Sequence, residues 1–98
     1  NTSMPPVHRK GDLCTGHGCF PPRPSAQGSP DVFVNAIPIH RVTDAWNPHS
    51  CGPPTHSSTQ CDGSPNVFAN TLKVARKGDP VCCGSKCMTH SPDVHANG

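Results

Sequence analysis

The chain contains few of the residues that usually build the core of a small protein. Its 98 residues include no Tyr, one Trp and three Phe, and only 32% of them are hydrophobic. A domain of this size buries a modest share of its surface even with an average composition. Its stability therefore requires a further support, which in small scaffolds is usually a set of disulfide bonds or a bound metal.

Long helices are also excluded, because 13 Pro and nine Gly interrupt the chain too often. An abundance of Pro and Gly is typical of disordered chains as well. Disorder is disfavoured here because only 14% of the residues are charged and the apolar residues form short clusters. The chain is therefore expected to fold as one domain of short strands.

Three function classes lack their sequence signatures. The formal charge is only +2 and no basic run occurs, so we expect no nucleic acid partner. There is no signal peptide and no apolar run approaching ~18 residues, and we expect neither Sec export nor a membrane span. Paired carboxylates and a supported Ser-His-Asp arrangement are absent, so we expect no enzyme.

Seven Cys and seven His make both kinds of support available. Because seven is an odd number, any disulfide scheme within one chain leaves at least one Cys unpaired. A cytosolic protein keeps its thiols reduced, which leaves them free to bind a metal. The alternative is a small secreted binding module, such as an inhibitor or a toxin, that zinc or disulfides stabilise.

One short pattern occurs three times, at residues 11–18, 43–50 and 78–84. In each copy an Asp is followed four or five residues later by a side chain that can bind a metal. These three side chains are His17, His49 and Cys83. A loop that ends in a ligand and is used three times indicates three loops that meet at one metal.

A longer unit surrounds this pattern. Residues 28–35 match residues 63–70, which lie 35 positions later, and residues 90–97 are a third version. Each unit begins with a Ser-Pro turn and a short β-rich run. In the first two units a hairpin turn is expected next, at 35–36 and 70–71, followed by a second strand. The pattern predicts an all-β fold in which each unit packs against its neighbours.

Several short motifs occur along the chain in a fixed order. They are the run Gly16-His17-Gly18-Cys19-Phe20-Pro21-Pro22, the Gly-Ser-Pro-x-Val-Phe-x-Asn segments and the Arg-x-Gly/Thr-Asp steps. From Val7 to Gly98 the chain therefore resembles the PAAR-repeat family, although the Pro-Ala-Ala-Arg signature itself is degenerate at 38–41 and 73–76. The resemblance implies a small cone of short β-strands around a pseudo-three-fold axis. Such a cone is the tip of the trimeric spike of a contractile injection machine, which is either a type VI secretion system or a myovirus tail.

The resemblance also implies the organisation of the chain and its location. A single PAAR-repeat domain is expected at residues 4–98, with three pseudo-repeats at about 7–41, 42–76 and 77–98. Asn1–Ser3 precede Met4 and are expected to be an expression scar. The expected location is a virion, at the tip of the tail spike, or the bacterial cytoplasm before export by type VI secretion.

In this family a zinc ion is bound by three His and one Cys near the apex of the cone. The ligands of Zn²⁺ that this pattern implies are His17, His49, His56 and Cys83. Four protein ligands close a tetrahedral site and make it structural, whereas a zinc hydrolase would need a water in the fourth position. Four further cysteines are rival ligands, namely Cys82, Cys51, Cys14 and Cys19.

The other titratable residues are expected to have structural roles. No metal role is expected for the histidines at strand or repeat-body positions, which should lie at the surface or the base: His8, His40, His90 and His95. The repeated Asp residues are expected to accept backbone hydrogen bonds that shape their turns: Asp12, Asp44 and Asp79. The Cys residues outside the ligand set are expected to be mostly reduced and to fill a thin core, with disulfides between units as the alternative.

A partner is implied at the broad end of the cone. One tip caps one trimeric spike protein, either VgrG-like or the central β-helix of a phage spike, and sharpens it for piercing the target membrane. Effector proteins are further candidate partners. The strands of the three units are expected to pair with the three strand edges of the spike. The residues expected to contact the spike are Val32, Val34, Val67, Ala69, Val94 and Ala96.

Overall fold

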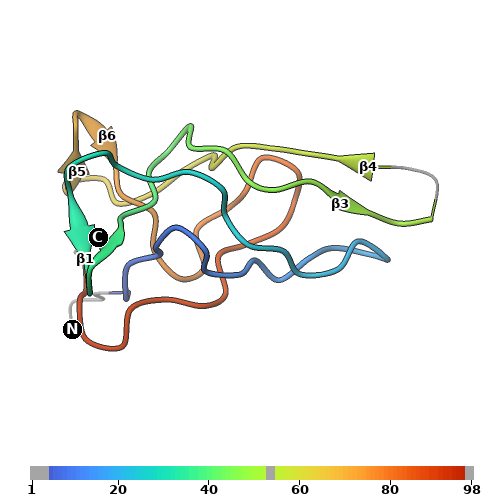
Figure 1. The fold of residues 1–98 in the computed structure, drawn as a ribbon, viewed down its shortest axis with the longest axis horizontal. Coiled ribbons are helices and arrows are strands. Elements are labelled where there is room, and N and C mark those ends of the chain that lie inside the picture. Colours follow the sequence, from blue (N-terminus) through green and yellow to red (C-terminus); the bar gives the residue numbers. More distant parts are fainter. Residues whose placement is uncertain (1–4, 53–54, 97–98) are drawn as a thin grey trace.

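The structure is a computed structural model that describes residues 5–52 and 55–96. These residues form six short strands, paired antiparallel in three two-stranded sheets (Figure 1). They form no helix, and hence none that could span a membrane. The strands are β1 (Phe33–Val34), β2 (Ile37–Pro38), β3 (His49–Ser50), β4 (Thr55–His56), β5 (Phe68–Ala69) and β6 (Leu72–Lys73). The expected all-β fold is confirmed. The expected scar at residues 1–3 and Asn97, at the end of the third unit, lie outside the described residues.

The hairpins β1–β2 and β5–β6 have equivalent registers and two-residue turns, at 35–36 and 70–71. The φ values are 54° and 63° in the first turn and 54° and 67° in the second. Two consecutive positive φ values are those of a type I′ turn, which matches the twist of the flanking strands. Both expected hairpins are therefore confirmed. Ala36 and Thr71 carry a Cβ at a position where Gly is preferred, so each turn is strained.

Replacement of Ala36 by Gly is expected to stabilise the protein by about 0.5–1 kcal/mol. A left-handed backbone costs a residue with a Cβ about 1–2 kcal/mol, which exceeds the roughly 0.5–1 kcal/mol entropic cost of a Gly. Urea unfolding measures the difference. Ala45→Gly is the matched control, because Ala45 is not among the residues with positive φ, and it should destabilise the protein. If Ala36→Gly is less stable than the wild type, the backbone at Ala36 is not strained.

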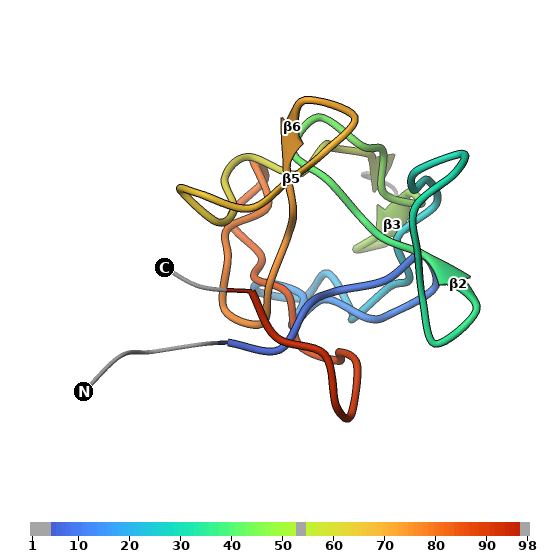
Figure 2. The same cartoon turned by 90° about the vertical axis from the view of Figure 1, so that its left-hand side faces the viewer.

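The third unit is completed by the start of the chain. His95 forms a β-bridge with Pro6, and the backbone N–H of Val7 donates to the carbonyl of Val94 over 2.9 Å. Residues 5–7 thus take the place that β2 and β6 have in the other two units. Figure 2 views the molecule from the end that carries β1, β2, β5 and β6, and shows the resulting lobes arranged around a common axis.

A ring of three backbone hydrogen bonds marks this axis. The N–H of His8 donates to the carbonyl of Ala75 (2.9 Å), Ala75 donates to His40 (2.9 Å), and His40 donates to His8 (3.1 Å). The three residues stand at matched positions, each directly before an Arg, and all three are 0% exposed. The expectation that His8 and His40 lie at the surface or base is therefore wrong, because the ring position places their side chains inside the molecule. His95, by contrast, is exposed.

The two buried histidines pack against Trp46. The ring centroids lie 4.9 Å from Trp46 for His8 and 5.1 Å for His40, and the two imidazoles are 5.2 Å apart. The Nδ1 atom of His8 lies 2.9 Å from the carbonyl oxygen of Thr89, and that of His40 lies 2.8 Å from the carbonyl oxygen of Gln27. Burial, and after it the neighbouring His40, lower the pKa of His8 to about 3. Burial likewise lowers the pKa of His40.

Acid is expected to destabilise the protein through His8, by about 1.4 kcal/mol of unfolding free energy per pH unit below the ordinary pKa of 6.5. The unfolded chain binds a proton on this imidazole from pH 6.5 downwards, whereas the folded protein binds it only near pH 3. The carboxylate of Asp12 and the carbonyl of Thr89 face His8 and oppose this shift without cancelling it.

Urea unfolding at several values between pH 7 and pH 5 tests this expectation. His8→Gln should give a shallower dependence of unfolding free energy on pH than the wild type. The exposed His95 provides the matched control, since His95→Gln should retain the wild-type dependence. If His8→Gln retains the full wild-type slope, His8 is not the group that titrates.

The apolar core is small and consists of two clusters. The first takes two residues from each unit: Val7, Val34, Ile39, Ala69, Val74 and Ala96. The second contains Cys14, Trp46, Ala75, Val81 and Cys87. The free thiols of Cys14 and Cys87 are thus used as small apolar side chains, as expected for part of the Cys set.

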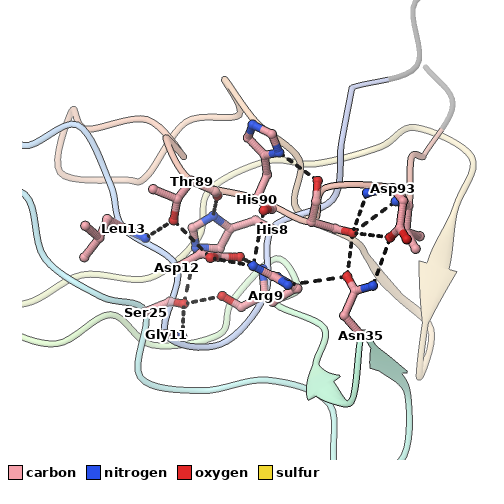
Figure 3. Close-up of polar contacts among 12 residues, drawn as sticks. His8, Arg9, Gly11, Asp12, Leu13, Ser25, Asn35, Thr89, His90 and Asp93 are labelled. Carbon is pink, nitrogen blue, oxygen red and sulfur yellow. Dashed lines mark hydrogen bonds and ion pairs between the residues drawn. The ribbon is translucent and has the colours of Figure 1, made fainter.

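The same Arg–Asp turn occurs in each unit. Its carboxylate accepts one hydrogen bond from the backbone N–H of the Arg and two from the guanidinium, in the pairs Arg9–Asp12, Arg41–Asp44 and Arg76–Asp79. The expectation that these Asp residues accept backbone hydrogen bonds is confirmed. Figure 3 shows the first pair, in which Arg9 also reaches Asn35 of the β1–β2 turn. Asn35 in turn donates to Asp93 over 2.9 Å, which ties the first unit to the third.

Candidate metal centre

Three segments carry the expected ligands, and one of them is the β3–β4 hairpin, which extends to the end of the molecule opposite β1, β5 and β6 (Figure 1). His49 and His56 are direct cross-strand partners in the β3–β4 hairpin. Directly opposed side chains on one face of an antiparallel pair lie close together, so this register brings the two imidazoles together. His56 thus enters the site as the partner of His49 rather than from a separate loop.

His17 is held by a tight turn of its own. It exchanges two backbone hydrogen bonds with Phe20, of 3.0 and 2.9 Å, and Gly18 within the turn has a φ of 55°. The preceding Gly16 has a φ of 71°, and a Cβ there would lie 2.5 Å from the carbonyl oxygen of Phe20. Gly16 is therefore required for the close approach that closes this turn.

Cys83 lies in a third turn, between Val81 and Ser85. The N–H of Gly84 donates to the carbonyl of Val81 (2.9 Å), and the N–H of Val81 donates to the carbonyl of Ser85 (2.8 Å). Gly84 has a φ of 108°, which favours Gly. The first and third of the repeated patterns therefore each end in a turn that presents one donor atom, and the second ends in strand β3, which presents His49.

The structure brings all four expected ligands together. The candidate donor atoms of His17, His49, His56 and Cys83 all lie within 4.8 Å of one another. The Nε2 atom of His56 lies 3.1 Å from that of His17 and 2.6 Å from that of His49. His49 is buried, with 5% of its surface exposed, and the other three are half-buried.

The surroundings of His49 leave its Nε2 atom free to bind. Its Nδ1 lies 2.8 Å from the carbonyl oxygen of Pro21. An N–H at Nδ1 donates to this oxygen, so the lone pair is on Nε2, as is usual for a metal-binding His. The ring of Phe20 packs against all three imidazoles, with centroid distances of 4.9, 4.9 and 4.2 Å to His17, His49 and His56.

The protonation states also favour a metal. Loss of solvation, followed by the nearby His49 and His17, lowers the pKa of His56 and favours its neutral form. Burial alone would raise the pKa of Cys83, but hydrogen bonds from Ser85 and Arg23 outweigh it and lower this pKa. Neutral imidazole and thiolate are the forms that bind metals.

The donor set fits a tetrahedral ion. With metal–nitrogen bonds of about 2.0–2.1 Å, the nitrogen–nitrogen edges of a tetrahedron are about 3.3 Å long. The Nε2 separations of 2.6 and 3.1 Å are shorter than this edge, and all four donor atoms lie within 4.8 Å of one another. Imidazole nitrogen and thiolate sulfur are also both ligands that zinc takes in closed, four-coordinate sites. The residues present can therefore hold a metal ion, and their individual roles as ligands stay a prediction.

Two disulfides remove most of the rival cysteines. Cys19 pairs with Cys51 and Cys61 pairs with Cys82, at Cα–Cα distances of 5.4 and 4.8 Å. The expectation that the cysteines outside the ligand set are mostly reduced is therefore wrong for these four. The physical reason for the first pair is proximity, because the turn that presents His17 and the β3–β4 hairpin that presents His49 place Cys19 and Cys51 side by side. Cys14 is fully buried and lies outside the cluster of four donors.

Repeated units around one axis, with a group of three His and one Cys at one end, define a small all-β protein with a candidate metal-binding tip. The model of the PAAR motif matches residues 16–89 of the 98, and the chain belongs to the PAAR-motif family. Proteins of this family are structural components associated with the spike tip in type VI secretion systems and phage tails. None of the curated proteins matches the chain.

Proposed function

We propose that this protein is the zinc-bound tip that caps and sharpens the trimeric central spike of a contractile injection machine. The observation that carries the proposal is the group formed by His17, His49, His56 and Cys83 at one end of a pseudo-three-fold molecule. A phage tail and a type VI secretion system both fit this role. The trimeric spike is the proposed partner, with one tip for each trimer.

Within this proposal zinc acts as a clamp. The ion would join the turn at His17, the β3–β4 hairpin and the turn at Cys83, which are otherwise held by few apolar contacts. Four protein donors leave no open position for a substrate water, which supports a structural rather than a catalytic ion. A rigid end that resists compression is what piercing of an envelope requires.

Five of the six residues expected to contact the spike belong to the first core cluster or pack against it, whereas Val32 is 37% exposed. Val34, Ala69 and Ala96 are 8%, 3% and 2% exposed, and Val67 and Val94 pack against the same core cluster. In addition, the carbonyl oxygens of Val32, Val67 and Val94 already accept hydrogen bonds from Ile39, Val74 and Val7. These three carbonyl groups are thus already used inside the molecule, which argues against strand pairing with a second chain at these residues.

The alternate residues of the same segments are the better contacts. Successive side chains of a strand point in opposite directions, so the neighbours of the buried residues point outwards. Phe33 and Phe68 are 55% and 53% exposed, and His95 has the equivalent position in the third unit. Two exposed aromatics and an imidazole around one axis match a partner with three equivalent subunits.

Binding to the trimeric spike protein of the same machine tests this proposal. The double variant Phe33→Ser/Phe68→Ser is expected to bind at least about tenfold more weakly in calorimetry, because exposed aromatics at interface centres each contribute more than about 1 kcal/mol. Met88→Ser is the matched control, since Met88 is an exposed apolar residue outside the three strand segments. A folded, zinc-loaded wild type that does not bind the trimer would refute the function, and a double variant that binds normally would refute the surface.

The two disulfides favour one second candidate, a secreted binding module held by oxidised thiols. The same measurements separate the two functions. A secreted module would fold without zinc as long as Cys19–Cys51 and Cys61–Cys82 are intact. It would also show no binding to a trimeric spike.

A further inference from the structure

Arg23 is a buried cation directly beside the candidate metal centre. Only 3% of the surface of Arg23 is exposed. The Nη2 atom lies 3.3 Å from Sγ of Cys83, and Cζ lies 5.5 Å from the centroid of the Trp46 ring. In the described part of the chain Nε and Nη1 have no hydrogen-bond partner, and no carboxylate lies within ion-pair distance.

Such a placement is costly and therefore calls for a reason. A guanidinium cannot release its proton in a protein, so burial cannot neutralise it. A buried charge without an anionic partner costs several kcal/mol. The ring of Trp46 offsets only part of this cost. The one group hydrogen-bonded to the guanidinium that can carry a negative charge is the sulfur of Cys83.

The repeat shows that Arg23 is specific to the first unit. The backbone hydrogen bond from Cys14 N–H to the carbonyl of Arg23 recurs from Trp46 to Ser58 and from Val81 to Ser85. The equivalent position in the other two units is therefore a Ser. Arg23 therefore stands in the first unit where the other two units have Ser, and its longer side chain reaches Sγ of Cys83 in the third unit.

We propose that Arg23 is the positioning residue of Cys83, and that its Nη2–H directs the sulfur toward the three Nε2 atoms and tunes its bond to the metal. The inference rests on the proposed metal-binding function. Ser85 Oγ, 3.8 Å from the same sulfur, provides a second and weaker contact. Nη2 of Arg23 and Oγ of Ser85 thus both contact the sulfur, and the candidate donor nitrogens of the three imidazoles lie within 4.8 Å of it.

Such a hydrogen bond has a spectroscopic consequence that mere structural support does not have. An N–H donor withdraws electron density from a thiolate, so more energy is needed to transfer an electron from the sulfur to the metal. Cobalt(II) is the appropriate probe because its thiolate charge-transfer band reports this energy directly. Loss of the donor moves the band to longer wavelength, and it also weakens the hold on the metal.

The experiment is a titration of the full-length, metal-free protein with Co²⁺, followed by absorption spectroscopy. Arg23→Met is expected to shift the charge-transfer band to longer wavelength and to weaken Co²⁺ binding about 10–100-fold, as loss of a ligand's hydrogen-bond partner usually does. Ser58→Ala changes the equivalent position of the second unit and should leave both values at those of the wild type. Identical bands and affinities for Arg23→Met and the wild type would overturn the proposal.

Arg23→Gln covers the case in which Arg23→Met does not fold. Gln is polar, but it is uncharged and shorter than Arg, so it loses the contact with the sulfur of Cys83, and a band at longer wavelength with weaker binding supports the proposal. An unshifted band with unchanged affinity overturns it. A wild type without any sulfur-to-cobalt band would refute the metal centre itself, which is a different outcome from failure of Arg23 alone.

Discussion

Removal of zinc with a chelator is expected to unfold the protein at neutral pH. Structural zinc in small domains contributes folding free energy on the order of 10 kcal/mol, whereas the whole net stability of a domain is about 5–15 kcal/mol. The chain has few means to make up this loss, because its apolar core consists of two small clusters that include Ala and Cys. The segments that carry the ligands would then be held chiefly by the disulfides Cys19–Cys51 and Cys61–Cys82.

Trp46 is a direct reporter of this unfolding. It is the single Trp of the chain and is 2% exposed. Its fluorescence emission should move to longer wavelength when chelator is added and should return when zinc is added back in excess. The measurement is made with the disulfides intact and again after reduction, because Cys19–Cys51 joins the turn that presents His17 to the β3–β4 hairpin that presents His49.

Loss of one donor should have a similar effect. His49→Ala removes the most buried of the three imidazoles, together with its hydrogen bond to Pro21. We expect this variant to lose zinc, measured by metal analysis, and to give the emission of the chelated protein. His95→Ala, at an exposed position outside the cluster, is the matched control. A reduced, chelated wild type with the emission of the untreated protein would show that the fold does not need the metal.

The repeat explains how much of the site could be predicted from the sequence. His17, His49 and Cys83 stand at matched positions in three units, so a common centre follows from their recurrence alone. His56 has no counterpart in the other units, and only the resemblance to a family indicated it. Its physical origin is the β3–β4 register, which a Pro-rich connection between Ser50 and Thr55 does not reveal.

The ring around the axis could not be predicted in the same way. His8 and His40 precede an Arg and read locally as polar surface residues, whereas Ala75 at the same position reads as apolar. Only the closed set of backbone hydrogen bonds, which joins residues far apart in the chain, places all three at the axis. Arg23 is a similar case, because it lies between two Pro residues and its equivalents are Ser.

Disulfide pairing depends on contacts between units and is likewise not encoded in local spacing. Cys61 and Cys82 come together because the backbone N–H of Cys61 donates to the carbonyl of Pro80 (3.0 Å) and that of Cys82 donates to Thr59 (3.0 Å). These bonds pair the second unit with the third. The expected cytosolic location predicted reduced thiols, whereas the Cα–Cα distance of 4.8 Å between Cys61 and Cys82 allows a disulfide.

Replacement of Asp44 by Ala is expected to destabilise the protein by about 3–5 kcal/mol, because it leaves the guanidinium of Arg41 buried without its anion. Asp44 and Arg41 are 2% and 8% exposed. The carboxylate accepts hydrogen bonds of 2.9 Å from the backbone N–H of Arg41, 2.8 Å from Nε and 2.9 Å from Nη2. The equivalent side chains of Asp12 and Asp79 are 11% and 13% exposed, so their loss should cost less.

Urea unfolding of zinc-loaded protein provides the measurement, and two further variants make it specific. Asp62→Ala removes an exposed ion pair with Lys73, at 3.6 Å, and should change the stability by less than about 1 kcal/mol. The double variant Arg41→Met/Asp44→Leu removes both charges together and should recover most of the lost stability, since the penalty comes from the unpaired charge rather than from the missing contact. If the double variant is no more stable than Asp44→Ala, the hydrogen bonds to the Arg41 backbone, and not the buried charge, determine the stability of this turn.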